Sequence, residues 1–116
     1  MVTLSCRPLT DYESRLLGRL LQPAFPGRDA IAEQIANSQV AQIDPNGSLT
    51  FSVKSNTKAG VKRRVPVEGE FEDADGVVIH VLLHVVDGIV NELEIYREDS
   101  SPIVSLPDPA SLIVPE

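Results

Sequence analysis

The residues best suited to chemistry are two histidines and a set of glutamates in the second half of the chain. His80 and His84 are four positions apart within an apolar, alternating stretch, and this even spacing places both imidazoles on one face of a β-strand. Glutamates occupy the same face of the two strands expected to flank them: Glu68, Glu70, Glu92 and Glu94. Imidazoles and carboxylates on one face can bind a divalent metal ion or form a proton-transfer pair.

The same pattern is also typical of a sheet face that is simply solvated. The expected strand pairing puts His80 between Glu68 and Glu94, with His84 diagonal to Glu92. Such cross-strand pairs of opposite charge contribute about 0.2–1 kcal/mol each without any ligand. A solvated face is therefore the first interpretation, a surface that binds a partner is the second, and a metal or catalytic site is the third.

Two further candidate sites have the wrong spacing or surroundings. Asp73-Ala74-Asp75-Gly76 resembles part of a calcium loop, but Phe71 and Leu82 stand at its first and twelfth ligand positions. Cys6 is the single cysteine, so it forms no internal disulfide, and nothing near it in the sequence favours a thiolate. The sequence also lacks glycine-rich phosphate loops and GxSxG, CxxC and HExxH motifs. We therefore expect no cofactor, no metal and no catalytic residue.

Charge is distributed unevenly along this acidic chain, whose formal net charge is −7. Residues 68–99 hold ten acids against Arg97 alone, whereas residues 45–67 hold no acid and five bases, namely Lys54, Lys58, Lys62, Arg63 and Arg64. Nucleic-acid binding combines such bases with stacking aromatics or a recognition helix, and neither accompanies them here. We expect a solvated basic loop between two strands, or a loop that contacts an acidic protein or the acidic half of this chain.

The size and hydropathy of the chain indicate one domain over residues 1–116. Its 116 residues are 42% hydrophobic, which suits a single compact core. The longest apolar run, 76–86, is far shorter than the roughly 20 residues of a membrane-spanning helix. The first residues lack the basic, apolar and small-residue succession of a secretory signal. We therefore expect a cytoplasmic protein without a membrane association.

Two helices are predicted at the start of the chain. Thr10 and Glu13 form a capping box, leucines follow at helical spacing, and Pro23 stops the ladder, so the first helix spans about 10–22. A second helix, about 28–37, follows the Pro26-Gly27 turn. Together they are expected to form a helical hairpin.

The apolar spacing changes to two after Ser38 and predicts five strands over about 39–97. For the first hairpin we expect a three-residue loop closed by Gly47. That loop pairs Ile43 with Leu49, and Ala41 with Phe51, on the core side.

The last hairpin is predicted to have a three-residue loop ending at Gly88. A two-residue loop would place Glu92 and Glu94 on the apolar face, which argues against it. The longer loop leaves Asn91 as the one polar residue on the core side.

The predicted fold class is α+β, with the helical hairpin covering a five-stranded antiparallel meander. The proline-rich segment 102–116 is too apolar for a free tail. We expect it to be extended and irregular and to lie against the body, with 103–106 along a sheet edge.

Several short motifs are similar to those of a known family. They include Arg7-Pro8-Leu9-Thr10, Val65-Pro66-Val67-Glu68, Leu83-His84-Val85 and Glu92-Leu93-Glu94-Ile95. With these, the chain resembles, over nearly its whole length, a family of small uncharacterised bacterial proteins, a domain of unknown function. The resemblance implies a bacterial, intracellular protein with two helices and a sheet. Some similar proteins are suspected of being immunity proteins, and no catalytic residue is carried over.

The leading hypothesis is a non-catalytic interaction protein that binds a basic protein partner, in the manner of an immunity protein. The candidate interaction surface is the acidic sheet face around His80, His84, Glu68, Glu92 and Glu94.

Two alternatives stay open. One is a small-molecule-binding protein or enzyme with a pocket between sheet and helices. Asn91 would be the one polar residue in that pocket, which argues against catalysis there. The other is a homo-oligomer formed through apolar residues of the outer sheet face, namely Val78, Leu82, Val90 and Tyr96.

Overall fold

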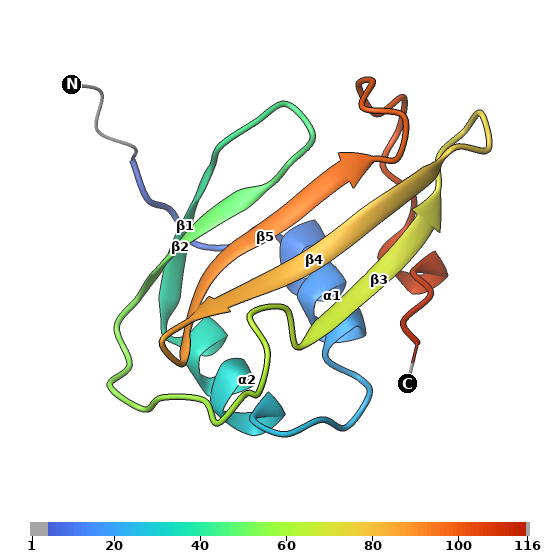
Figure 1. Cartoon of the computed structure of the whole chain (residues 1–116). Coiled ribbons are helices and arrows are strands. Elements are labelled where there is room, and N and C mark those ends of the chain that lie inside the picture. Colours follow the sequence, from blue (N-terminus) through green and yellow to red (C-terminus); the bar gives the residue numbers. More distant parts are fainter. Residues whose placement is uncertain (1–4, 116) are drawn as a thin grey trace.

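A computed structural model describes residues 5–115 and shows two helices behind a five-stranded antiparallel sheet (Figure 1). The predicted α+β class is confirmed. The elements are α1 (Asp11–Leu20), α2 (Arg28–Ala36), β1 (Ser38–Gln42), β2 (Leu49–Val53), β3 (Val67–Glu72), β4 (Val78–Val86), β5 (Ile89–Arg97) and the 3-10 turn η1 (Pro109–Ser111). Among these residues, no helix is both long and apolar enough to span a membrane.

Both helices begin where their local sequence predicts, although they contact different strands of the sheet and do not form the closely packed hairpin that was expected. Glu13 donates its N–H to the Thr10 hydroxyl at 3.1 Å, and Thr10 donates its N–H to the Glu13 carboxylate at 2.8 Å, which completes the capping box. The buried leucines of α1 and the buried Ile31 of α2 face the core. Helix α1 contacts β3 and η1, whereas α2 contacts β1 and β5.

The strand order is β1-β2-β5-β4-β3, so the predicted simple meander is wrong. A meander would place β3 beside β2, but β5 occupies that position and pairs Leu49 with Leu93. The reason lies in the segment 54–66, which is much longer than the two to five residues of an ordinary hairpin loop. This segment leads to the opposite edge of the sheet, where β3 lies, and leaves the edge of β2 free to pair with β5. Ser48, buried beside this pairing, donates to and accepts from the backbone of Ile95.

The register of the first hairpin differs from the prediction by one residue. Val40 pairs with Phe51, and Ile43 donates its N–H to the Ser48 carbonyl at 2.9 Å, which leaves a four-residue loop, 44–47. The Asp44 carboxylate stabilises this loop by accepting the N–H groups of Asn46 and Ser48. A one-residue slip exchanges the two faces of a strand. Val40 is therefore fully buried, whereas Ile43 is 40% exposed.

This register predicts that a threonine destabilises the protein much more at position 40 than at position 43. Val40→Thr places a hydroxyl in the core and should lower the free energy of unfolding by about 1–3 kcal/mol. Ile43→Thr should change it by less than about 0.5 kcal/mol, because the side chain is largely in solvent. Urea unfolding of both variants gives the comparison, and a larger loss at Ile43 would contradict the register.

The last hairpin has the two-residue loop, Asp87-Gly88, that the sequence argued against. Both residues have positive φ, 52° and 77°, as a type I′ turn requires. A bulge shifts the register between His84 and Val85, so that β5 carries one residue more than β4 at that point. The glutamates therefore stay outside despite the short loop. Asn91, expected on the core side, is exposed, and Val90, expected outside, is buried.

Both edges of the sheet are covered by single residues from outside the strands. Arg7 and Val40 of β1 exchange two backbone hydrogen bonds of 2.8 Å, and Ile113 and Glu70 of β3 exchange two of 2.9 Å. Gly69 permits the second contact, because a Cβ there would lie 3.0 Å from the Leu112 side chain. The segment predicted along a sheet edge, 103–106, forms no strand, and the C-terminal segment pairs with an edge strand only at Ile113 among the described residues.

Candidate functional site

The face of β3, β4 and β5 that points away from the helices, hereafter the outer face, is strongly acidic. It is turned toward the viewer in Figure 1. Alternate residues of these strands are buried in the core, which leaves the intervening residues on the outer face. The ionisable ones are His80, His84, Glu68, Glu70, Glu72, Glu92 and Glu94, with Glu98 just beyond β5. All five residues of the predicted interaction surface are therefore on one face.

The neighbours of His80 differ from those predicted. It lies opposite Glu70 on β3 and Tyr96 on β5, not between Glu68 and Glu94. Its ring stacks on Tyr96 with 5.0 Å between centroids, and its Nε2 is 3.2 Å from a Glu98 oxygen. The short loop and the bulge shift the pairing of β5 with β4 by two residues relative to the prediction. A shift of two changes the cross-strand partner of each residue but leaves its side chain on the same face of the sheet.

His84 is held between a base and an acid. It lies directly opposite Glu92 rather than diagonal to it. Arg64 donates from Nε to His84 Nδ1 at 3.1 Å, and His84 Nε2 is 2.9 Å from a Glu94 oxygen. Because Nδ1 accepts a hydrogen bond, the proton of the neutral ring is on Nε2 and is donated to Glu94. The result is a directed hydrogen-bonded row, Arg64 to His84 to Glu94.

The same region contains a set of residues of the kind that binds metal ions. Nitrogen and oxygen atoms of His84, Glu92 and Glu94 lie within 4.8 Å of one another. Zinc coordination needs an unprotonated imidazole nitrogen, with the other ring nitrogen donating its proton to a neighbour. Here Nε2 carries the proton and Nδ1 faces the positive Arg64. A metal ion would therefore have to displace Arg64 and reverse the tautomer of His84.

Arg64 should consequently oppose zinc binding. In Arg64→Ala, a tenfold excess of zinc should raise the melting temperature by at least about 2 °C more than in the wild type, because ligand binding stabilises the native state. Arg63→Ala, which removes the same charge next to it, is the control and should behave as the wild type. Equal zinc shifts in all three proteins would show that Arg64 does not control the ring. Differential scanning fluorimetry suffices for the measurement.

A buried arginine was missed at the other end of the sheet. Arg97 faces the core, with a side chain only 4% exposed, and its guanidinium contacts Asp73, Asp75 and Asp99 at 2.7–2.9 Å. The hydrogen bonds that Arg97 donates to Asp99, Asp73 and Asp75 raise the pKa of Arg97 above its ordinary value. The sequence signal was its even spacing from Leu93 and Ile95, both core residues. Asp73 and Asp75, which resembled a calcium loop, are instead partners of a cation within the protein.

Asp73 also fixes the segment after β5. Its fully buried carboxylate accepts the backbone N–H groups of Val104 and Ser105 at 2.8 and 3.0 Å. Burial acts to raise the pKa of Asp73, but these amides, Ala74 N–H and Arg97 outweigh it and hold that pKa well below its usual range. The pKa of Asp99 is also lowered, chiefly by Arg97 and then by Ser101. We therefore interpret this cluster as structural: it holds the segment after β5 in place.

The basic segment lies between β2 and β3, and its five bases are exposed, as predicted, but its backbone is anchored to α2 and to the last hairpin. Gln34 of α2 is fully buried and donates to the carbonyls of Thr57 and Gly88, while its own oxygen accepts Val90 N–H. Ala59 N–H is donated to Gly88 at 2.8 Å. Among the described residues, none of the segment's five bases is in an ion pair. Within residues 5–115, Arg64 is the one base of the segment whose side chain bonds to a side chain of residues 68–99, namely His84.

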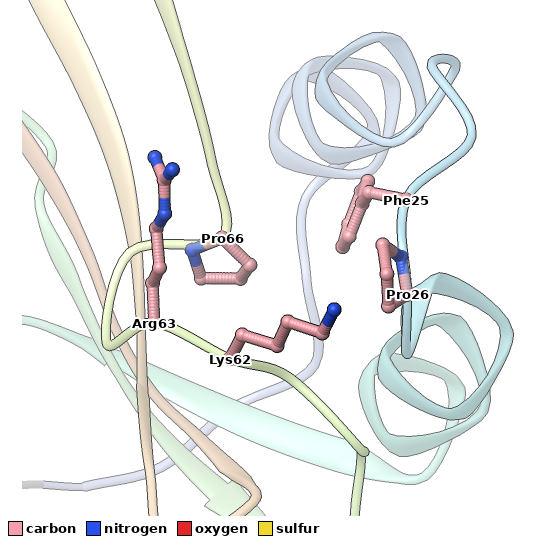
Figure 2. A pocket seen from close by; sticks show the side chains of 5 residues that line it. All are labelled: Phe25, Pro26, Lys62, Arg63 and Pro66. Carbon is pink, nitrogen blue, oxygen red and sulfur yellow. The ribbon is translucent and has the colours of Figure 1, made fainter.

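A hollow of about 250 Å³ opens between this segment and the connection from α1 to α2 (Figure 2). This hollow, hereafter the ring hollow, is lined by Phe25, Pro26, Lys62, Arg63 and Pro66. An adjoining hollow of about 390 Å³ shares three of these residues and extends to Glu68. A third, of about 200 Å³, lies between α1 and β5. None of the three is lined by Asn91, the polar residue that the small-molecule alternative named, or by His80.

Comparison with known proteins gives a family without an assigned activity. Residues 6–107 match a family described as a domain of unknown function, DUF6984. No curated protein and no solved structure matches the chain.

Proposed function

We propose an interaction function for this chain, which belongs to the DUF6984 family, a domain of unknown function. In this proposal the protein is a non-catalytic module whose outer face binds a basic surface of a protein partner. The observation that carries it is the gathering of six glutamates on one sheet face that neither helix covers. The only base that contacts this face among the described residues, Arg64, is engaged by His84.

The outer face has the composition of a contact surface as well as its charge. Tyr96, opposite His80, is 38% exposed on this face, and Leu82 on the neighbouring strand is half-buried. Aromatic residues are enriched where protein interfaces concentrate their binding energy, and a surrounding field of one sign accelerates encounter with a partner of the opposite sign. Tyr96 stacked on His80 would serve as the anchor, with the glutamates setting the choice of partner.

An immunity-like role is the specific form of this proposal. A small acidic protein that covers the basic surface of a toxin needs charge complementarity and no catalytic group. Self-association through the same face is less well supported, because two copies would bring like charges together, and Val90, one of its proposed apolar contacts, is buried.

The test compares two triple variants with the same net charge. The face variant is Glu70→Gln, Glu92→Gln and Glu94→Gln, and the matched control is Asp11→Asn, Asp29→Asn and Glu33→Gln on the helices. Binding partners are captured from cells, and the dissociation constant of the purified partner is measured at two salt concentrations. The face variant should bind at least about tenfold more weakly, whereas the control keeps binding.

Two results would contradict the proposal. One is a face variant that binds as well as the wild type, and the other is an equal loss in both variants, which would indicate total charge rather than a site. The immunity form makes a further demand: co-production of this protein should protect cells from the captured partner. A captured partner that is harmless would remove that form.

A further inference from the structure

The geometry points to a second site, independent of the outer face: the ring hollow binds a small organic anion in which one anionic group is attached to a flat apolar ring. No part of the proposed interaction function requires this site. It lies at the edge where the connection between the helices meets the start of β3, away from His80 and Tyr96.

The walls of the ring hollow are rings. Figure 2 shows Phe25 and Pro26 on one side and Pro66 on the other, with the Lys62 side chain running across the gap between them. Arg63 rises beside Pro66. A volume of about 250 Å³ is below the usual range of roughly 300–1,000 Å³ for pockets that bind drug-sized ligands. The site is therefore matched to a single substituted ring placed between Phe25 and Pro66.

The polar groups of the lining select an anion. Proline has no N–H to donate, so hydrogen bonds from side chains in this hollow must come from Lys62 and Arg63. Neither base is in an ion pair with a described residue, although the protein as a whole is strongly acidic. Arginine binds carboxylate or phosphate oxygens in pairs, and lysine adds a second charge.

The two walls are fixed before any ligand arrives. Gly27 adopts a φ of +88° and packs so closely that a Cβ would lie 2.8 Å from the Val61 side chain, which locks the helix connection onto the basic segment. On the other side, Val85 N–H is donated to the Arg64 carbonyl at 2.7 Å and holds the segment against β4. A preformed site binds without the cost of ordering its walls.

Glu68 limits what the ligand can carry. It lines the adjoining hollow, which continues from the ring hollow through Phe25, Arg63 and Pro66. A second anionic group that reached this hollow would meet the Glu68 carboxylate and be repelled. The ligand class is therefore a ring with a single anionic group, such as a carboxylate or a phosphate monoester.

Titration calorimetry with simple probes tests the chemistry. Benzoate and phenyl phosphate distinguish the two kinds of anionic group, and binding of either one with a dissociation constant below about 10 mM supports the site. Benzamide keeps the ring without the charge, while acetate and inorganic phosphate keep the charge without the ring. Each of these three should bind at least about tenfold more weakly than the better ring anion.

Matched variants test the place. Lys62→Gln with Arg63→Gln should weaken binding at least about tenfold, whereas Lys54→Gln with Lys58→Gln, which removes equal charge from the same segment outside the hollow, should weaken it less than about twofold. The inference is overturned by no binding of either ring anion up to about 10 mM, by equal binding of acetate or inorganic phosphate, or by equal loss in both variants. Because no outer-face residue is changed, these results are separate from the partner-binding test.

Discussion

Arg97→Met is expected to lower the melting temperature by about 10–20 °C, one of the two largest single-residue effects in this protein. The substitution keeps an unbranched side chain in the core but removes the guanidinium. The buried carboxylate of Asp73 then loses its cation, while Asp75 and Asp99 repel each other without a bridge. Removing one partner of a buried pair costs more than the pair itself contributes, because the remaining charge stays out of water.

Thermal unfolding followed by circular dichroism measures this effect. Arg15→Met is the control, because Arg15 is half exposed and pairs with Asp11 and Asp108 at the surface. Its loss should lower the melting temperature by less than about 3 °C. If both substitutions had the same small effect, the Arg97 cluster would contribute no more than a surface pair.

The cluster also fixes how stability responds to acid. The pKa values of Asp73 and Asp99 are lower in the folded protein than the value of about 3.9 in an unfolded chain. Their contribution is therefore fully present above about pH 5 and is lost progressively as the pH falls below 4, since the unfolded chain binds the protons first. Urea unfolding between pH 7 and pH 2.5 should show this decline, and it should be shallower in Arg97→Met. Parallel curves for the two proteins would be the contrary result.

Gln34→Leu is expected to cost about 3 kcal/mol, because a single buried amide serves three backbone groups. Leucine restores none of its hydrogen bonds, and Val90 N–H and the Thr57 carbonyl are left without a described partner. Each unsatisfied buried backbone group costs about 1–3 kcal/mol. The Gly88 carbonyl is affected less, since it still accepts Ala59 N–H.

Urea unfolding gives the loss in free energy, and hydrogen exchange shows where it arises. The Val90 amide should exchange faster than its neighbours in β5, because it loses the acceptor that protects it. Gln22→Leu, at an exposed position after α1, should change the stability by less than about 0.5 kcal/mol. A loss below 1 kcal/mol in Gln34→Leu would mean that water replaces the amide.

The sequence predicts what depends on local signals and fails where distant segments decide. The capping box at Thr10 and the leucine stripe of α1 need only their own helix, so the helices and the α+β class are predicted correctly. The first register fails because the Asp44 hydrogen bonds choose the loop length. The strand order fails because the destination of the 54–66 segment depends on contacts made by Gln34 and Gly88.

The candidate surface illustrates the same division. His80, His84 and the glutamates of β3 and β5 are predicted on the correct face, because a register error of two residues preserves the face and changes only the partners. His80 therefore remained with the glutamates but faces Glu70 and Tyr96. Val90 and Asn91, next to the bulge, have exchanged faces relative to the prediction. The ring hollow could not be predicted, since it unites Phe25 with Lys62, which are far apart in the sequence and share no motif.

The two single-residue contacts at the sheet edges have a consequence for how this protein behaves at high concentration. An open strand edge is a template onto which another molecule can add, and this is a common start of aggregation. Arg7 on β1 and Ile113 on β3 occupy these two templates. The segments that contain Arg7 and Ile113 are therefore expected to protect the sheet edges against aggregation. During synthesis, the edge of β3 cannot be covered until Ile113 has left the ribosome. We therefore expect the nascent chain to be more prone to aggregation than the complete fold during that time.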